Sequence, residues 1–450
     1  MRGHAATTGT YGWNFGTSSG SMSPAGGPAS QSYWGWNYQV IDQSKKLIPA
    51  DARGYYSRFH WWVEDIHGNI LTKDLVVSEA SIVRALSGPS QISFKVSPYD
   101  QSVQLPNGQG PILFKPWGHL VHAVKEDLNG NEQIWASGIV QPSDVDPSSD
   151  VMTLKAEGFS KYLKGLPWLE DFNPLAVDPA DIFNHIWTHV QSFPNGNLGV
   201  TVTNPDGSTP ATTGTKILPG FSFQNQEFVQ NFFAIFIRKT DRNDCFDYID
   251  KLCRDTPIEF KEDARWNPDT GKIDKFIRIA YPFIGTIQEG IVFRLGENVK
   301  NQHQKIETEI NWLSDITMKG YLPGQEIDAE IANPDPNRLR RVMDEADLHV
   351  DSNERAQAWA HRLLTRRQVP HYFEQLIVDP YAYAAPFMSY DVGDFVAVQG
   401  NMAWIGPVNL QHKILMIGWD EKQGSLQLNT MVDGAFNYDP IEYVQPGAAP

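Results

Sequence analysis

Two stretches of the sequence are alike: Gly118-His-Leu-Val-His-Ala-Val124 and Gly393-Asp-Phe-Val-Ala-Val398. Each is followed by a turn, an apolar strand, a second turn and an alternating strand, so that residues 118–154 and 393–428 follow one plan. Alternating strands joined by short turns are typical of antiparallel β-meanders. The pattern predicts two related β modules in one chain. A chance likeness between two unrelated meanders remains the alternative.

The first stretch lies in a predicted β module, residues 56–165. Strands are expected at residues 58–64, 70–76, 91–96, 118–124, 133–140 and 151–159. Turns at His67-Gly68-Asn69 and Asn129-Gly130-Asn131 join two pairs of these strands into hairpins. Short strands with Gly and Asn turns favour a small barrel or sandwich.

The second stretch lies in residues 346–436, predicted to be a similar module that begins with a helix. One face of that helix is apolar and carries Ala356, Trp359, Ala360, Leu363 and Leu364. Strands are expected at residues 371–378, 393–398, 412–420 and 425–432.

Residues 166–345 are predicted to form a mixed α/β domain between the two modules. A helix is expected after Asp178-Pro179, because Asp caps free N–H groups and Pro fits the first helical turn. A surface loop at 195–220, a strand at 232–237, a helix at 241–254 and strands at 258–261 and 275–281 follow.

Composition excludes several classes of protein. The chain has 450 residues with 37 Lys and Arg against 53 Asp and Glu, a formal charge of −16. Its apolar content is too high for a disordered protein, and a phosphate-tracking surface would need an excess of cations. The only two cysteines, Cys245 and Cys253, would lie about 12 Å apart on the predicted helix, too far for a disulfide. We expect reduced thiols and synthesis in a reducing cytoplasm, and the sequence contains no apolar run long enough for a membrane span.

The N-terminal segment, residues 1–55, differs from the rest of the chain. No Asp, Glu, Lys or Arg occurs from Gly3 to Ile41, yet the segment is rich in aromatic residues. Trp and Tyr favour burial at interfaces, so we predict an arm that orders on a neighbouring subunit. The proposed contact residues are Trp13, Phe15, Trp34 and Trp36. A disordered leader is the alternative, and residues 437–450 are expected to be a frayed tail.

The sequence offers one pair of candidate metal ligands. His185 and His189 are four residues apart on a predicted helix, so they share a face. Ile186 follows His185, where the metalloprotease motif has Glu. We interpret the two as histidines at the edge of an amphipathic helix.

No catalytic, cofactor-binding or metal-binding residues are predicted. The sequence contains no phosphate-binding glycine loop. Three carboxylate pairs could serve a glycosidase in principle, but they are expected in turn-like, solvated stretches. These pairs are Glu126-Asp127, Glu170-Asp171 and Glu262-Asp263.

An ordered series of short motifs carries a family resemblance over residues 56–436. The motifs are Ser90-Gln-Ile-Ser-Phe-Lys-Val-Ser-Pro98, Trp117-Gly118-His119, Ala136-Ser-Gly-Ile-Val140, Leu154-Lys-Ala-Glu-Gly158, Tyr281-Pro282 with Gly285, Phe293 with Gly296-Glu-Asn298, residues 356–364, Ala385-Pro386-Phe387 and Gly393-Asp394. In this order they resemble minor tail proteins of long-tailed actinobacteriophages, of the tail-hub or baseplate-hub-like type. The arm lies outside the resemblance.

The resemblance implies a mainly β chain with an α+β insertion: two tube-like β-barrel modules plus a mixed α/β domain. It also implies a homotrimer at the tail tip of the virion, whose six modules match a sixfold tail tube. The expected partners are the distal tail protein, the tape measure protein and other minor tail proteins. An acidic lumen would repel DNA phosphate, so DNA would pass without specific binding.

Two alternatives remain open at this point. A cell-wall-degrading tail protein would need His185 and His189 to converge with a third ligand. A glycan-binding tail protein would use exposed Trp side chains of the arm.

The arm gives the first testable prediction. Deletion of residues 1–41 should leave the fold of the remaining chain intact and impair its assembly, because the arm carries contact residues rather than core. Circular dichroism and incorporation into particles measure the two effects. Normal assembly of the shortened chain would show that the segment is only a leader.

Overall fold

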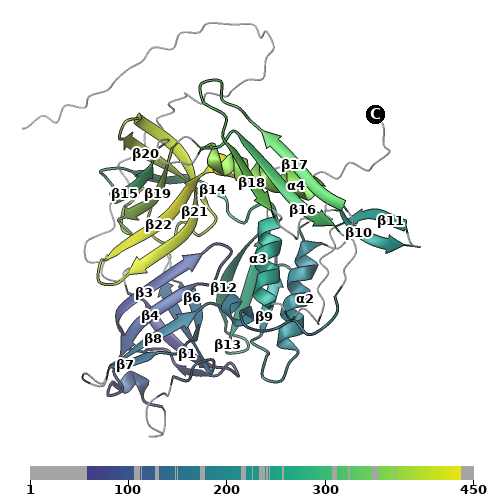
Figure 1. Ribbon diagram of the computed structural model, residues 1–450. Coiled ribbons are helices and arrows are strands. Elements are labelled where there is room, and N and C mark those ends of the chain that lie inside the picture. The colour runs from purple at the N-terminus through teal and green to yellow at the C-terminus, as the bar shows by residue number, and fades with distance from the viewer. Residues whose placement is uncertain are drawn as a thin grey trace, which may run out of the picture. The chain divides into compact units, whose positions relative to one another are not determined.

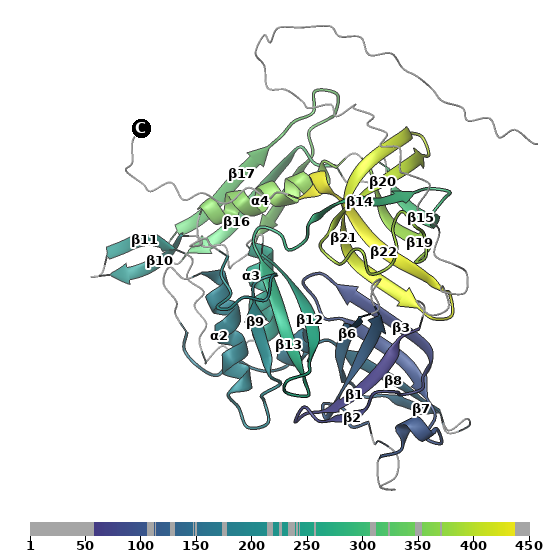
Figure 2. The same ribbon diagram turned by 180° about the vertical axis from the view of Figure 1, so that it is seen from behind.

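The computed structural model describes residues 58–105, 112, 114–126, 131–146, 148, 151–172, 178–213, 219–224, 227–232, 239, 242, 244–255, 258–306, 312–322, 325–346, 353–369 and 371–436. Over these residues the chain is mainly β, as predicted, and a sheet of 14 strands dominates it (Figures 1 and 2). The arm with Trp13, Phe15, Trp34 and Trp36 and the tail 437–450 lie outside the described residues.

The large sheet has two halves. The first contains β1 (His60–Asp65), β2 (Ile70–Thr72), β3 (Ser78–Ala85), β4 (Gln91–Val96), β5 (His119–Glu126), β6 (Glu132–Val140), β7 (Asp144–Asp146) and β8 (Val151–Glu157). The second contains β14 (Ile287–Arg294), β15 (Val299–Lys305), β19 (Tyr372–Val378), β20 (Phe395–Met402), β21 (Gly406–Asp420) and β22 (Ser425–Val432).

The two halves correspond strand for strand. The first runs β1-β5-β6-β8-β4-β3, and the second runs β14-β20-β21-β22-β19-β15. One pair differs in direction, because β1 is antiparallel to β5 whereas β14 is parallel to β20. The shared order confirms the two related meanders predicted from the sequence, β5-β6-β8 and β20-β21-β22.

A single long strand joins the halves. The first part of β21 pairs with β20, and its last five residues pair antiparallel with β3, from Met416 opposite Ala85 to Asp420 opposite Ser81. Aromatic rings pack across this boundary, with 4.7 Å between the ring centroids of Phe59 and Trp419. The two halves therefore share one apolar core.

The predicted barrels are not confirmed. Among the described strands the main path of the large sheet ends at β2 on one side and at β15 on the other, and neither half closes on itself. The boundary predicted at residue 345 also does not separate the strands, because β14 and β15 precede it and pair with β20 and β19, which follow it.

Two smaller α/β units accompany the large sheet (Figure 1). In one, α2 (Pro179–Gln191) and α3 (Cys245–Asp255) share a core with β9 (Val200–Thr203), β12 (Glu259–Asn267) and β13 (Lys272–Ala280). In the other, α4 (Asn353–Arg367) packs on β16 (Asp315–Leu322), β17 (Gln325–Ala332) and β18 (Val342–Ala346). A separate hairpin consists of β10 (Pro219–Gln224) and β11 (Glu227–Phe232), and short 3₁₀ turns occupy Gln101–Val103, Phe159–Leu163 and Asp433–Ala435.

Several elements differ from the sequence-based expectations. The loop predicted at 195–220 contains β9, which pairs in parallel with β13, and also the first residues of β10. The strands β3 and β14 to β18 were not predicted. The strand expected at 232–237 lies largely outside the described residues, whereas the apolar face of α4 is confirmed by the burial of Ala356, Ala360 and Leu364.

A tight glycine contact gives the second prediction. A Cβ on Gly285 would lie 1.8 Å from the carbonyl oxygen of Gly393, just before β20. Gly285→Ala should therefore force two backbone segments apart and lower the free energy of unfolding by about 1–3 kcal/mol or more. Urea denaturation measures the loss.

The matched control is Gly290→Ala, since a Cβ there meets no atom within 4 Å. The free energy of unfolding of this variant should stay close to that of the parent protein. Equal stability of the two variants would contradict the contact between Gly285 and Gly393.

Candidate functional site

Buried and partly buried charged side chains connect β12 to both halves of the large sheet. Glu259 lies at the start of β12, and its Oε1 is 2.5 Å from Nζ of Lys413 in β21. Two residues on, Nζ of Lys261 is 2.9 Å from Oδ2 of Asp391, which precedes β20. The other oxygen of Asp391 lies 2.8 Å from Nη1 of Arg84 in β3. Asp391 thus joins β12, the second half and the first half in one contact.

Charge and burial act in opposite directions on Asp391. Burial alone would raise the pKa of its carboxyl group, but the cations Arg84 and Lys261 hold that pKa below its usual value. The carboxylate is therefore ionised at neutral pH, and the contact is a true ion pair within the protein.

Glu262 makes a second connection between β12 and the first half. Its carboxylate accepts hydrogen bonds from the backbone N–H of Ser90 at 3.0 Å and from the N–H and hydroxyl of Ser160, both at 2.7 Å. Burial raises its pKa, and these hydrogen bonds oppose the shift. The approach is so close that a Cβ on Gly158 would lie 1.8 Å from Oε2 of Glu262. The expectation that Glu262 is solvated is wrong, because a strand carries it into the interface.

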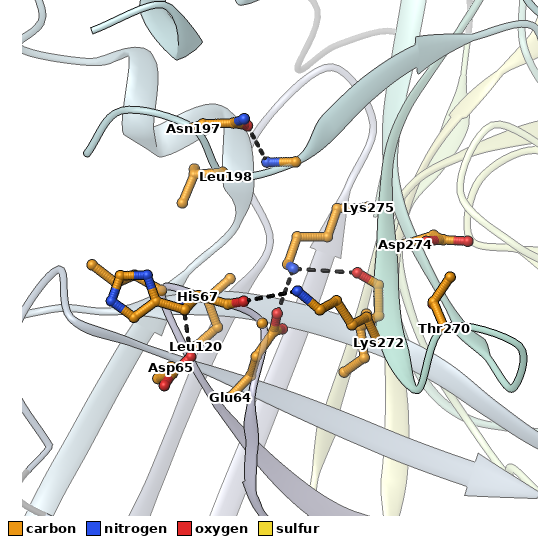
Figure 3. Close-up of a pocket in the computed structure, with 14 residues that line it drawn as sticks. Glu64, Asp65, His67, Leu120, Asn197, Leu198, Thr270, Lys272, Asp274 and Lys275 are labelled. Atoms are coloured by element: carbon orange, nitrogen blue, oxygen red, sulfur yellow. Dashed lines mark hydrogen bonds and ion pairs between the residues drawn. The ribbon is translucent and has the colours of Figure 1, made fainter. Parts of the chain in front are cut away.

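A polar pocket of about 320 Å³ opens beside this interface (Figure 3). It lies between the β1–β2 turn, the segment before β9 and the β12–β13 hairpin. Nζ of Lys272 donates to the carbonyl oxygen of His67 across the pocket at 3.2 Å. The carboxylate of Asp65 closes the β1–β2 turn by accepting from the N–H groups of His67 and Asn69 at 2.8 and 2.9 Å.

A buried ion pair between Glu64 and Lys275 lines the pocket, with 2.7 Å between Oε1 and Nζ. The other oxygen of Glu64 is 2.9 Å from Nε2 of His122, whose Nδ1 lies 2.8 Å from the hydroxyl of Ser137. Burial lowers the pKa of His122, so its neutral ring donates to Glu64 and accepts from Ser137.

The same contacts fix the charge of Glu64. Burial alone would raise its pKa, but His122 and Lys275 bring that pKa below its usual value. Each of the four polar side chains has a hydrogen-bond partner, and together the contacts join β1, β5, β6 and β13.

Lys125 in β5 is a buried cation that sequence reasoning missed. Its Nζ has no hydrogen-bond partner among the described residues and lies 5.1 and 5.4 Å from the ring centroids of Phe59 and Phe387. Burial lowers its pKa to about 8. Only the position of a Lys directly after the apolar predicted strand 118–124 could have indicated this contact.

The two candidate metal ligands converge on a carboxylate. His185 Nε2 lies 2.5 Å from Oε1 of Glu170, and His189 Nδ1 lies 3.5 Å from Oε2. The ring of Phe172 stacks on His185 at 3.9 Å. No group of three metal-ligating side chains in the described part of the chain is placed to hold a metal ion. Asp178 caps α2 as predicted.

His412 lies where β21 changes partner, opposite both Val396 of β20 and Val432 of β22. Its Nε2 accepts from the N–H of Phe373 at 3.0 Å, and its Nδ1–H donates to the carbonyl oxygen of Leu410 at 3.3 Å. Burial, with a smaller effect from the charge of His371, lowers its pKa to about 4. The neutral ring is thus part of the folded state.

Comparisons with known proteins agree with this architecture. No protein-family model and no curated protein match the sequence. The 43 kDa tail protein of prophage MuSo2 from Shewanella oneidensis has a TM-score of 0.50 at 15 % identity, over 84 % of this chain and 98 % of that one. A tail protein from Neisseria meningitidis MC58 has a TM-score of 0.51 at 12 % identity, over 84 % and 97 %.

The chain therefore has the fold of phage tail proteins. The resemblance found in the sequence is confirmed at that level, while the link to actinobacteriophages stays a prediction. Within the described residues, none of the helices has the length and apolar character needed to cross a membrane.

His412 gives the third prediction. With a pKa near 6.5 in the unfolded chain and about 4 in the folded one, its neutral form stabilises the fold fully above pH 6.5. That contribution, about 3 kcal/mol, should be lost as the pH falls from 6.5 to 4. His412→Gln keeps an acceptor for Phe373 but cannot titrate, so its stability should fall less steeply over this range. Urea denaturation at pH 7, 5.5 and 4.5 measures both slopes.

The control variant is His60→Gln, at an exposed position of β1. Its free energy of unfolding should depend on pH as steeply as that of the parent protein. Equal slopes for His412→Gln and the parent would contradict the neutral, buried ring.

Proposed function

We propose that this chain is a structural hub subunit of a phage tail, which joins the tail tube to the distal tip as a homotrimer. The observation that carries the proposal is the pair of equivalent sheet halves within a chain whose fold is that of phage tail proteins. Three such chains would present six similar halves, which matches a threefold hub to a sixfold tube. The tube-like character of the modules would then arise in the ring, where open sheet ends meet.

The contacts of β12 support a rigid, structural role. A ring of six quasi-equivalent modules closes only when the two halves of each chain keep a fixed relative orientation. Hydrogen-bonded ion pairs depend strongly on distance and direction, and here Asp391 contacts both Arg84 and Lys261. These contacts hold the orientation that ring closure requires.

The remaining parts of the proposal follow from charge and from the arm. The chain carries a formal charge of −16, so a trimeric lumen would repel DNA phosphate and let DNA pass. The arm with Trp13, Phe15, Trp34 and Trp36 would contact neighbouring subunits in the virion. We place the distal tail protein, the tape measure protein and other minor tail proteins as neighbours, in a phage of actinobacteria.

The fourth prediction tests this assembly. Sedimentation analysis should give three times the chain mass of 50.6 kDa, and cryo-electron microscopy of virions should place the trimer at the tail tip. A strict monomer that never enters particles would refute the proposal.

An activity assay provides the complementary measurement. A peptidoglycan clearing assay with purified protein should show no zone. Clearing that disappears in His185→Ala would instead favour the cell-wall-degrading alternative.

A further inference from the structure

The correspondence between the two halves extends to the junction that joins them. Inside the chain, the edge strand of the first half, β3, pairs with the last five residues of β21 in the second half. The counterpart of β3 in the second half is β15, since both lie at the far end of the equivalent strand orders. If the junction has a counterpart too, β15 should pair with the segment of the first half that corresponds to the end of β21.

That segment is β7. The end of β21 pairs with β22, with Trp419 opposite Leu426, and β7 pairs with β8, with Val145 opposite Met152. Leu426 and Met152 are equivalent, because each also faces the last residue of a corresponding strand, Val378 in β19 and Val96 in β4. Strands β6 and β7 together therefore correspond to the single long strand β21.

Both members of this second junction have one free side. Among the described residues β15 pairs with β19 as its one strand neighbour, apart from an isolated bridge between Val299 and Leu295, and β7 pairs with β8 alone. They belong to opposite halves of the large sheet (Figures 1 and 2). Unpaired strand edges are templates for pairing with another chain.

Charge favours pairing between these two edges. β15 carries the cations Lys300 and Lys305, whereas β7 reads Asp144-Val-Asp146. Nζ of Lys305 also lies 2.6 Å from Oε1 of Glu374 in β19. The carboxylate of Asp144 is 83 % exposed, although Nζ of Lys155 lies 3.0 Å away. Opposite charges on facing strands stabilise pairing, and like charges oppose the pairing of β7 with another β7. The contact therefore fits two different edges of two copies.

The internal register can be carried over to the new pair. In the internal junction Asp420 faces Ser81, and Ser81 faces Ser93 of β4. The counterpart of Ser93 is Gln375, which faces His303. The counterpart of Asp420 is Asp146, so the register places Asp146 opposite His303.

We propose that β15 of one copy adds antiparallel to the free edge of β7 in a second copy, so that the junction within each chain is repeated between chains. This inference rests on the proposed homotrimer and names the surface that builds it. The contact is heterologous, because one copy uses β15 and the other uses β7, and three such contacts close into a ring.

Cysteine cross-linking of the purified full-length protein tests the contact. The double variant Asp146→Cys with His303→Cys, treated with a short bis-maleimide, should give covalent species of two and three chains on a denaturing gel. Each single variant should give no covalent oligomer. In a heterologous contact residue 146 of one copy faces residue 303 of another, and neither residue faces its own equivalent. The parent protein controls for the native thiols, of which Cys245 is buried.

The matched control is the internal junction. Ser81→Cys with Asp420→Cys should cross-link within one chain, because these residues are opposite each other in the fold. This variant should therefore show modified thiols without a higher covalent mass.

The outcomes separate this inference from the proposed function. A trimer by sedimentation whose double variant forms no covalent oligomer would overturn the β7–β15 contact and leave the hub proposal standing. Covalent oligomers in a single variant would overturn the contact as well. A strict monomer would overturn both.

Discussion

The placement of charged residues on β12 is the constraint on which the rest of the structure depends. Glu259 and Lys261 face Lys413 and Asp391 of the second half, while Glu262 accepts three hydrogen bonds from Ser90 and Ser160 of the first half. Loss of one member of a buried pair leaves an uncompensated charge and costs about 3–5 kcal/mol. An apolar contact would tolerate a small rotation, but these paired groups have few favourable alternatives. The relative position of the halves is thus set by directional contacts as well as by apolar packing.

The local elements could be read from the sequence because their signals are local. The helix α2 begins with Asp178 accepting from the N–H of Ala180 at 2.9 Å and continues with a buried stripe, both of which follow from residue type and spacing. The meanders were predicted from alternation and turn residues. The strand β15 was missed since four of its residues in a row are exposed and no alternation marks it. Its pairing is determined by β19, which lies about seventy residues further along the chain.

The polar contacts could not be predicted for the same reason. Glu259 and Lys413 are 154 residues apart in the sequence, and no local pattern links them. Glu262 belongs to a run of charged residues, a pattern that predicts solvent exposure. It is buried because of the position that β12 takes in the folded chain. His185 and His189 did share a helix face as predicted, yet the side chain that meets both, Glu170, lies before the helix. Spacing in the sequence identifies a face, and tertiary structure decides what that face meets.

The length of β21 has a mechanical consequence. Its residues 406–413 pair with β20 and its residues 416–420 pair with β3, while β22 lies along the other side from His412 onward with a register shift between Ile414 and Met416. One strand thus crosses from half to half. A pull along this strand loads its backbone hydrogen bonds side by side, because they lie perpendicular to the chain direction. Bonds loaded in this way share the force and must give way together rather than one after another. Tension across the boundary between the halves is therefore carried by the covalent chain and by the hydrogen bonds between strands, rather than by a hinge.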